Sequence, residues 1–187
     1  SATIGNTELA GQFLAGVGRE FEVVTADVTR DMEITVEHPE PNEEDTATAD
    51  ELNTTPETAA RLRRIVEIIS RHRATLVFTN TRDEAELLGH RLARLLGEEA
   101  IGVYHGSLDK EERESLEEGL RSGRVRAVVT TSSLELGIDI GHIDAVIQYS
   151  SPRQVVKLIQ RIGRSGHRLG RKALGHVITR DVDDYLE

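Results

Sequence analysis

Residues 74–96, ATLVFTNTRDEAELLGHRLARLL, contain the part of the sequence that decides the fold. Positions 74–79 form a short apolar run typical of a buried strand, and apolar residues then recur at helical spacing over 82–96. Gly97 predicts the end of this helix. A buried strand followed directly by a helix predicts one unit of a parallel β-α-β fold.

The same alternation continues on both sides of this unit. Thr55 and Pro56 are typical of a helix start, and they predict a helix over 55–73. Further helices are expected over 109–121 and from Ser151-Pro152 onward, and strands over 32–36, 101–104, 125–130, 143–148 and 173–179. The fold class is therefore α/β, a doubly wound parallel sheet with helices on both faces, whose ligands bind at the carboxyl ends of the strands.

The first 55 residues have a different character. A short amphipathic helix is expected between Asn6 and Gly16, followed by a β-prone run over 21–25. Apart from the strand over 32–36, the segment 26–55 is acidic and rich in threonine, and the composition of 39–55 predicts a mobile loop.

The charge distribution is strongly asymmetric although the net charge is −10. Positions 31–57 hold acids and no Lys or Arg, whereas positions 145–180 hold bases and no acid: Arg153, Lys157, Arg161, Arg164, Arg168, Arg171, Lys172 and Arg180. A segment that gathers guanidinium groups and excludes carboxylates is typical of a surface that faces phosphate. A solvated cationic face without a ligand is the alternative, and charge alone does not separate the two.

Composition excludes several classes of protein. The chain has no cysteine, so it has no disulfide framework, thiol nucleophile or thiolate zinc site. Its seven histidines do not recur at the spacing of ~3–5 residues that a helical or finger-type metal site uses, so no metal site is expected. No apolar stretch approaches the ~18 residues that span a membrane. We expect a cytoplasmic protein with no membrane partner.

Four short strings could carry chemistry: TNTR over 79–82, HGS over 105–107, TTSSLELGIDI over 130–140 and QRIGRSGHR over 160–168. Three offer small hydroxyl residues, glycine or exposed backbone N–H groups, which hold anionic oxygens, and the fourth adds arginines among glycines. The sequence has no G-x-x-x-x-G-K-[ST] motif and no Asp-Glu pair at a strand end to hold magnesium. The strings therefore describe half of a phosphate site.

Taken in order, these strings resemble the later motifs of superfamily 2 helicases, and in particular those of the large-helicase-related (Lhr) family. The strings over 79–82 and 103–107 resemble motifs IV and IVa, those over 131–139 and 160–168 resemble motifs V and VI, and Ser1-Ala2-Thr3 resembles motif III. The resemblance covers essentially the whole chain. It implies a RecA-like fold.

The resemblance also implies a domain layout and a cofactor. Residues 1–25 would be the C-terminal remnant of motor domain 1, 26–55 the interdomain linker and 56–187 motor domain 2. ATP with Mg²⁺ would be bound mainly by the first motor domain, which this sequence lacks, so the fragment alone is not expected to hydrolyse ATP. The implied activity is that of an ATP-dependent 3′–5′ DNA helicase or translocase.

By resemblance, Arg164 is the arginine finger that reaches the γ-phosphate of ATP, with Arg161 and Arg168 as further catalytic candidates. The implied ATP-binding set is completed by residues of the motif V and VI strings: Gly137, Asp139, Gln160 and His167. Many relatives have arginine where this chain has His167, so either His167 or Arg168 contacts the phosphate. Asp139 could instead cap a helix or turn.

The implied nucleic-acid contacts are Thr81, Arg82, Gly106, Arg113 and Thr131. Contacts of this kind touch the sugar-phosphate backbone, so binding should be salt-sensitive and independent of sequence. Arg82 and Arg113 could instead form ion pairs on helix surfaces. The expected partner is single-stranded or forked DNA. RNA is possible, as is a non-enzymatic RecA-like binding module.

Overall fold

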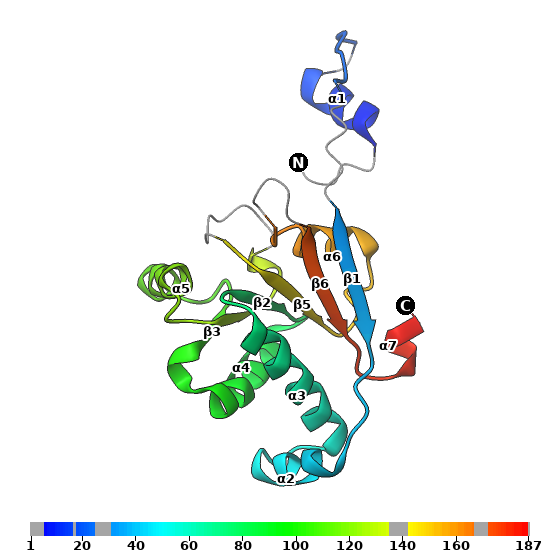
Figure 1. Cartoon of the computed structure of the whole chain (residues 1–187). Helices are drawn as coiled ribbons and strands as arrows, with labels where there is room; N and C mark the ends of the chain where they lie inside the picture. The colour runs from blue at the N-terminus through cyan, green and yellow to red at the C-terminus, as the bar shows by residue number, and fades with distance from the viewer. Residues whose placement is uncertain (1–5, 17, 25–30, 135–141, 167–171, 187) are drawn as a thin grey trace.

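The computed structural model describes residues 6–16, 18–24, 31–134, 142–166 and 172–186. Its strands form a six-stranded, all-parallel sheet in the order β1-β6-β5-β2-β4-β3 (Figure 1). The strands are β1 Met32–Glu37, β2 Thr75–Phe78, β3 Ile101–Tyr104, β4 Ala127–Thr130, β5 Ala145–Tyr149 and β6 Ala173–Ile178. The doubly wound parallel sheet predicted from the sequence is confirmed.

Helices cover both faces of this sheet. Helices α3 (Pro56–Arg71) and α4 (Arg82–Leu96) pack on one face, and α5 (Lys110–Ser122) and α6 (Val155–Ile162) pack on the other. Side chains of β2 alternate accordingly, with Val77 in the first core and Leu76 and Phe78 in the second. The period-two alternation of a strand thus divides the apolar residues between two separate cores.

The helix ends follow local signals in the sequence. Thr55 accepts a hydrogen bond from the Thr58 N–H at the start of α3, and Pro56 occupies its first position. Helix α5 begins at Asp109 with a reciprocal capping box and ends at Gly123, which has a φ of +85°. These boundaries agree with the expected ones.

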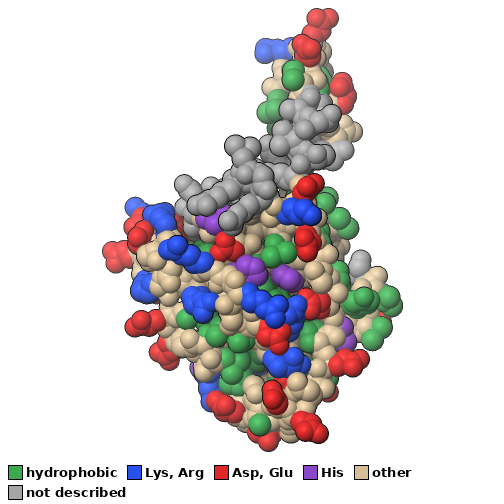
Figure 2. All heavy atoms as spheres, viewed as in Figure 1, with side chains coloured by type: hydrophobic (Ala, Val, Ile, Leu, Met, Phe, Trp, Pro, Cys, Tyr) green, Lys and Arg blue, Asp and Glu red, His purple; other side chains and the backbone are tan. Residues whose placement is uncertain are grey.

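The expected loop over 39–55 is wrong, because Glu43–Glu51 forms helix α2. The Asn42 side chain caps this helix by accepting from the Asp45 N–H, and the Asn42 N–H donates in turn to the Asp45 carboxylate. The buried carboxylate of Asp45 also pairs with Arg63 of α3 at 3.0 Å. The helix therefore packs on α3 despite its acidic composition, and Figure 2 shows acidic side chains gathered at this lower end of the molecule.

The N-terminal segment contains helix α1 (Thr7–Ala15) in the stretch where an amphipathic helix was expected, and Asn6 caps it by accepting a hydrogen bond from the Leu9 N–H. Within the described residues 18–24 there is no strand, so the β-prone run from Phe21 does not form one there. Helix α1 has no buried residue and stands apart from the sheet, and Phe13 is 87 % exposed (Figure 1).

Candidate functional site

The candidate residues lie at two opposite ends of the sheet. The loops after β2, β3 and β4 leave the carboxyl ends of neighbouring strands, as expected. The fourth string does not, because residues 160–166 end helix α6 and return to the amino end of β5. There the Gly166 N–H donates to the Ile143 carbonyl at 3.3 Å, and Ser165 forms a β-bridge with Ile143. The end of the fourth string therefore lies at the opposite edge of the sheet from the other three strings.

At the carboxyl end, the start of α4 lies beside the loop after β3. Thr81 caps α4 by accepting a hydrogen bond from the Glu84 N–H at 3.2 Å. The guanidinium of Arg82 donates to Oγ of Ser107 at 3.0 Å. Arg82 thus leans toward the next loop and brings two of the predicted strings together.

His105 holds the shape of the loop after β3. It is 4 % exposed, and its Nε2 lies 2.6 Å from Oε1 of Glu86. The Ser107 N–H donates to Nδ1 at 3.3 Å, so Nε2 carries the proton and donates to Glu86. Gly106 lies between them, and a Cβ at this position would be in ordinary contact with Ser133 Oγ at 3.7 Å. The buried His105 therefore fixes this loop through Glu86 and the Ser107 N–H.

Arg113 and Thr131 complete this end of the sheet. Arg113 donates through Nε to the Asp109 carbonyl at 3.2 Å, within the first turn of α5. Thr131 follows β4, and its hydroxyl lies 3.4 Å from that of Ser133. The described nucleic-acid candidates therefore all lie after β2, β3 or β4, on adjacent strands.

Arg161 points into the domain. It is 3 % exposed, its NH1 donates to Oε1 of Gln148 at 2.6 Å, and its guanidinium carbon lies 5.2 Å from the centre of the Phe78 ring. Phe78 and Gln148 are register partners on β2 and β5. Gln148 in turn donates through Nε2 to the Ser150 carbonyl at 2.8 Å. Arg161 thereby joins the end of α6 to the two central strands.

Gln160 and Arg164 are half-buried at the end of α6. The Arg164 N–H donates to the Arg161 carbonyl at 3.0 Å, so the last turn fixes the position of the Arg164 Cα. Four other predicted nucleotide residues, Gly137, Asp139, His167 and Arg168, lie outside the described residues.

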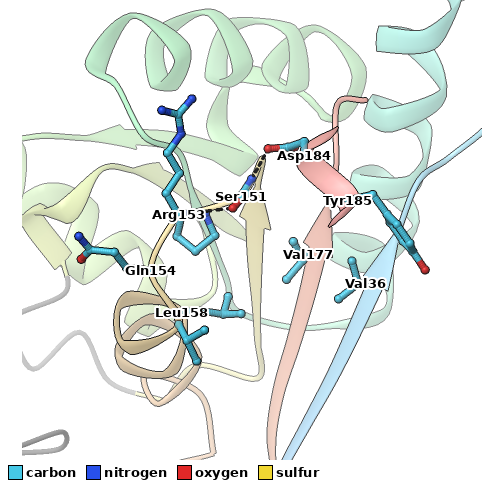
Figure 3. A pocket seen from close by; sticks show the side chains of 10 residues that line it. Val36, Ser151, Arg153, Gln154, Leu158, Val177, Asp184 and Tyr185 are labelled. Carbon is cyan, nitrogen blue, oxygen red and sulfur yellow. Dashed lines mark hydrogen bonds between the residues drawn. The ribbon is translucent and has the colours of Figure 1, made fainter. Parts of the chain in front are cut away.

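The loop between β5 and α6 was not among the predicted site segments. A helix was expected to open at Ser151-Pro152, but α6 begins at Val155. The loop contains non-glycine residues with positive φ, +68° at Ser150 and +58° at Arg153. Asp184 stabilises this loop by accepting hydrogen bonds from the Ser150 hydroxyl at 2.9 Å and from the Ser151 N–H at 2.7 Å. Figure 3 shows the bond from Ser151. Burial opposes the ionised form of Asp184, but the N–H groups of Ser151 and Arg180 and the Ser150 hydroxyl outweigh it and lower its pKa.

Two negative findings apply to the described residues. They contain no group of three or more His, Cys, Asp or Glu side chains that could hold a metal ion. None of the helices seen in those same ranges is long and apolar enough to cross a membrane.

A sequence profile described as "Helicase conserved C-terminal domain" matches residues 58–169. The chain belongs to this helicase family. The match begins in α3 and includes every described candidate residue. The matched range contains strands β2 to β5 of the sheet, whereas β1 and β6 lie outside it.

Among individual relatives, the chain is 40 % identical over 190 residues to the ATP-dependent helicase Lhr-Core of Methanocaldococcus jannaschii, covering 100 % of this chain and 21 % of that protein. A solved structure of Mycobacterium smegmatis helicase Lhr bound to ssDNA and AMP-PNP aligns with a TM-score of 0.84 and 35 % identity, over 98 % of this chain and 24 % of that one. The DUF1998 helicase MrfA bound to DNA and AMPPNP aligns at 0.67 and 26 %, over 100 % of this chain and 26 % of that one. The chain thus spans about a fifth of the length of the curated relatives it matches.

Proposed function

We propose that this domain is the second motor domain of an ATP-dependent helicase or translocase that moves 3′ to 5′ along DNA. The observation that carries the proposal is the alignment of 98 % of the chain, at a TM-score of 0.84, with a helicase Lhr bound to both ssDNA and a nucleotide analogue. A cytoplasmic location belongs to the same proposal.

At the carboxyl end of the sheet, Thr81, Arg82, Gly106, Arg113 and Thr131 contact the sugar-phosphate backbone of one strand. The hydrogen bond from Arg82 to Ser107 supports this, because it aligns cationic and hydroxyl groups of two loops along one edge. Backbone contacts fix position without reading bases, so the domain grips any sequence, and the grip weakens with salt.

At the amino end, Arg164 acts as the arginine finger. The nucleotide, with Mg²⁺, is bound mainly by motor domain 1, and its γ-phosphoryl group is what hydrolysis transfers to water. The donor set supports this division: Gln160 and Arg164 suit phosphate oxygens, and the described residues offer no acidic cluster for Mg²⁺. Gly137, Asp139, His167 and Arg168, which lie outside the described residues, are proposed by resemblance as further ligands of the same nucleotide.

For Arg161 we propose a positioning role. The Arg161 guanidinium, which is 3 % exposed and donates to Gln148, anchors the end of α6. The Arg164 N–H donates to the Arg161 carbonyl, so Arg164 follows this anchor directly. The guanidinium of Arg161 thereby sets where Arg164 emerges. It remains part of the catalytic apparatus because it holds the finger in position.

The proposed layout has residues 1–25 as the end of motor domain 1, 26–55 as the linker and 56–187 as motor domain 2. Strand β1 of the linker pairs with β6 over its whole length, so the linker supplies the edge strand of this sheet before it continues into α2. Because β1 is held in the sheet of motor domain 2, it gives the linker a fixed point relative to which motor domain 1 moves.

The test is Arg164→Ala in the full-length protein. DNA-stimulated ATP hydrolysis should fall by about 10³–10⁵-fold, the usual contribution of an arginine finger, while nucleotide binding is largely retained. Arg94→Ala, on the surface of α4, is the matched control. Undiminished turnover in Arg164→Ala removes the finger assignment. Single-stranded RNA tested as activator beside single-stranded DNA decides which nucleic acid drives the motor.

A further inference from the structure

A cavity of about 590 Å³ lies between the start of α4 and the start of α6. We call it the switch-point cavity. It is lined by residues that follow β2, β4, β5 and β6: Asn80, Thr81, Glu84, Ser132, Pro152, Arg153, Gln154, Lys157, Arg161 and Arg180. Only Thr81 and Arg161 among them belong to the candidate site proposed above.

The topology accounts for the position of this cavity. Strands β2 and β5 are neighbours, but the chain leaves β2 through α4 on one face and leaves β5 through α6 on the other. The two connections diverge and leave a crevice outside the carboxyl ends of the strands, which is where doubly wound sheets bind ligands.

The lining of the switch-point cavity is cationic. It contains Arg153, Lys157, Arg161 and Arg180 against a single acid, Glu84, whose carboxylate pairs with Arg180 at 2.9 Å. In a chain of net charge −10, such a concentration of positive charge in one cavity favours an anion.

The β5–α6 loop, which forms one wall of the switch-point cavity, has a strained backbone. Arg153 has a φ of +58°, its N–H donates to the Ser151 hydroxyl at 3.0 Å, and Asn80 donates to the Ser151 carbonyl at 2.8 Å. Strained backbone persists only where its surroundings hold it, and such places cluster at ligand sites. Figure 3 shows the Arg153 side chain extending away from Val36 and Val177, which line a small apolar cavity on the other side of the loop.

Helix α6 starts without a side-chain cap. Its N-cap residue Gln154 makes no capping hydrogen bond, and its first turn holds no acid. The first N–H groups of an uncapped helix attract anions, and here they lie beside Arg153 and Lys157. Two independent features, the cationic lining and the uncapped start, therefore suit the same ligand.

We propose that the switch-point cavity binds a phosphate group of the nucleic-acid strand. This rests on the proposed function and extends it, because the cavity lies on the side of β2 away from Gly106 and Arg113. The nucleic-acid strand then follows the ends of β3, β4 and β2 and continues over the end of β5. Its contact surface on this domain is therefore longer than the one formed by the residues of the helicase-like motifs alone.

The experiment measures binding of a fluorescein-labelled single-stranded DNA to this chain by anisotropy at several salt concentrations. The double variant Arg153→Gln/Lys157→Gln should weaken binding about tenfold or more, because it removes charge-assisted hydrogen bonds to phosphate. The slope of log K against log salt should become shallower by about 0.7 for each phosphate that the variant no longer neutralises. The matched control is Arg71→Gln/Arg94→Gln, which removes two surface charges elsewhere and should leave the slope nearly unchanged.

Arg82→Gln separates failure of this inference from failure of the proposed function. If Arg82→Gln weakens binding while Arg153→Gln/Lys157→Gln behaves like the control pair, the switch-point cavity holds no phosphate and the proposed strand contacts stand. If the unaltered chain binds no DNA, the proposed strand contacts fail and this inference fails with them. Thermal melting of each variant verifies that it is folded.

Discussion

The guanidinium of Arg161 lies 2.6 Å from Oε1 of Gln148 and 5.2 Å from the centre of the Phe78 ring, although it comes from the end of a helix that faces the opposite edge of the sheet. A single side chain thus connects the proposed nucleotide edge to the central strands. Because those strands end at the proposed DNA edge, the contact gives a rigid path between the two sites.

Gln148→Met tests this connection. The substitution keeps side-chain volume but removes the acceptor for Arg161 and the donor to the Ser150 carbonyl, both in a buried setting. Loss of a hydrogen bond to a buried charged group costs about 1.5–3 kcal/mol, and the free energy of unfolding from urea titration should fall by that amount. The exposed Gln154→Met should change it by less than about 0.5 kcal/mol. Equal effects of the two variants would show that the buried hydrogen bond contributes nothing.

Local signals explain why so much of the fold could be predicted. Thr55-Pro56, Asp109 and the glycines after α4 and α5 mark helix ends by chemistry that needs no tertiary contact. Helix α2 was missed because its acidic composition suggested a mobile loop, although the Asn42-x-x-Asp45 spacing of a capping box was present. The acidic composition led to the wrong prediction of a loop, whereas the capping-box spacing would have predicted the start of a helix.

The direction of Arg161 could not be predicted in the same way. Its side chain turns inward because Phe78 and Gln148 stand side by side on β2 and β5, and that register depends on strands far apart in the chain. The strained β5–α6 loop depends likewise on Asp184, which lies beyond β6. Motifs name the residues of a site, but only the assembled sheet gives their orientation.

Asn42→Ala should selectively destabilise α2. The Asn42 side chain accepts hydrogen bonds from the N–H groups of Glu44 and Asp45, and loss of such a cap costs about 0.5–2 kcal/mol. Hydrogen exchange should accelerate over Glu43–Glu51 and remain unchanged in β2. Thr46→Ala, in the same helix, is the control and should leave exchange nearly unaltered. Uniform acceleration across the sheet would contradict a local role.

Asp184→Asn should loosen the β5–α6 loop. Its carboxylate accepts from the Ser150 hydroxyl and from the N–H groups of Ser151 and Arg180, and an amide offers one oxygen for these three donors. The loss should be about 1–2 kcal/mol in the free energy of unfolding at pH 7, measured with urea. Because the pKa of Asp184 is lowered in the folded protein, its contribution is present above about pH 4 and disappears as pH falls further. Asp183→Asn, at an exposed position of the short helix α7 (Val182–Leu186) that also holds Asp184, should behave like the unaltered chain at pH 7 and at acidic pH.

His176 should make the free energy of unfolding depend on pH in a higher pH range than Asp184 does. Its Nδ1 lies 3.3 Å from Oε1 of Glu37, which also accepts from Arg64 at 3.0 Å. Burial lowers the pKa of His176 below its ordinary value of 6.5 and outweighs the opposing attraction of Glu37, while the charges of Arg64 and His72 lower it further.

The unfolded chain therefore takes up a proton at His176 more readily than the folded one, and the contribution present above about pH 6.5 is lost as pH falls through and below that value. Urea titrations at pH 7.5, 6.5 and 5.5 should show a declining free energy of unfolding. His176→Gln, which cannot protonate, should flatten that decline, whereas the control His90→Gln on the surface of α4 should not. A decline that is identical in His176→Gln would place the proton uptake elsewhere and remove His176 as its source.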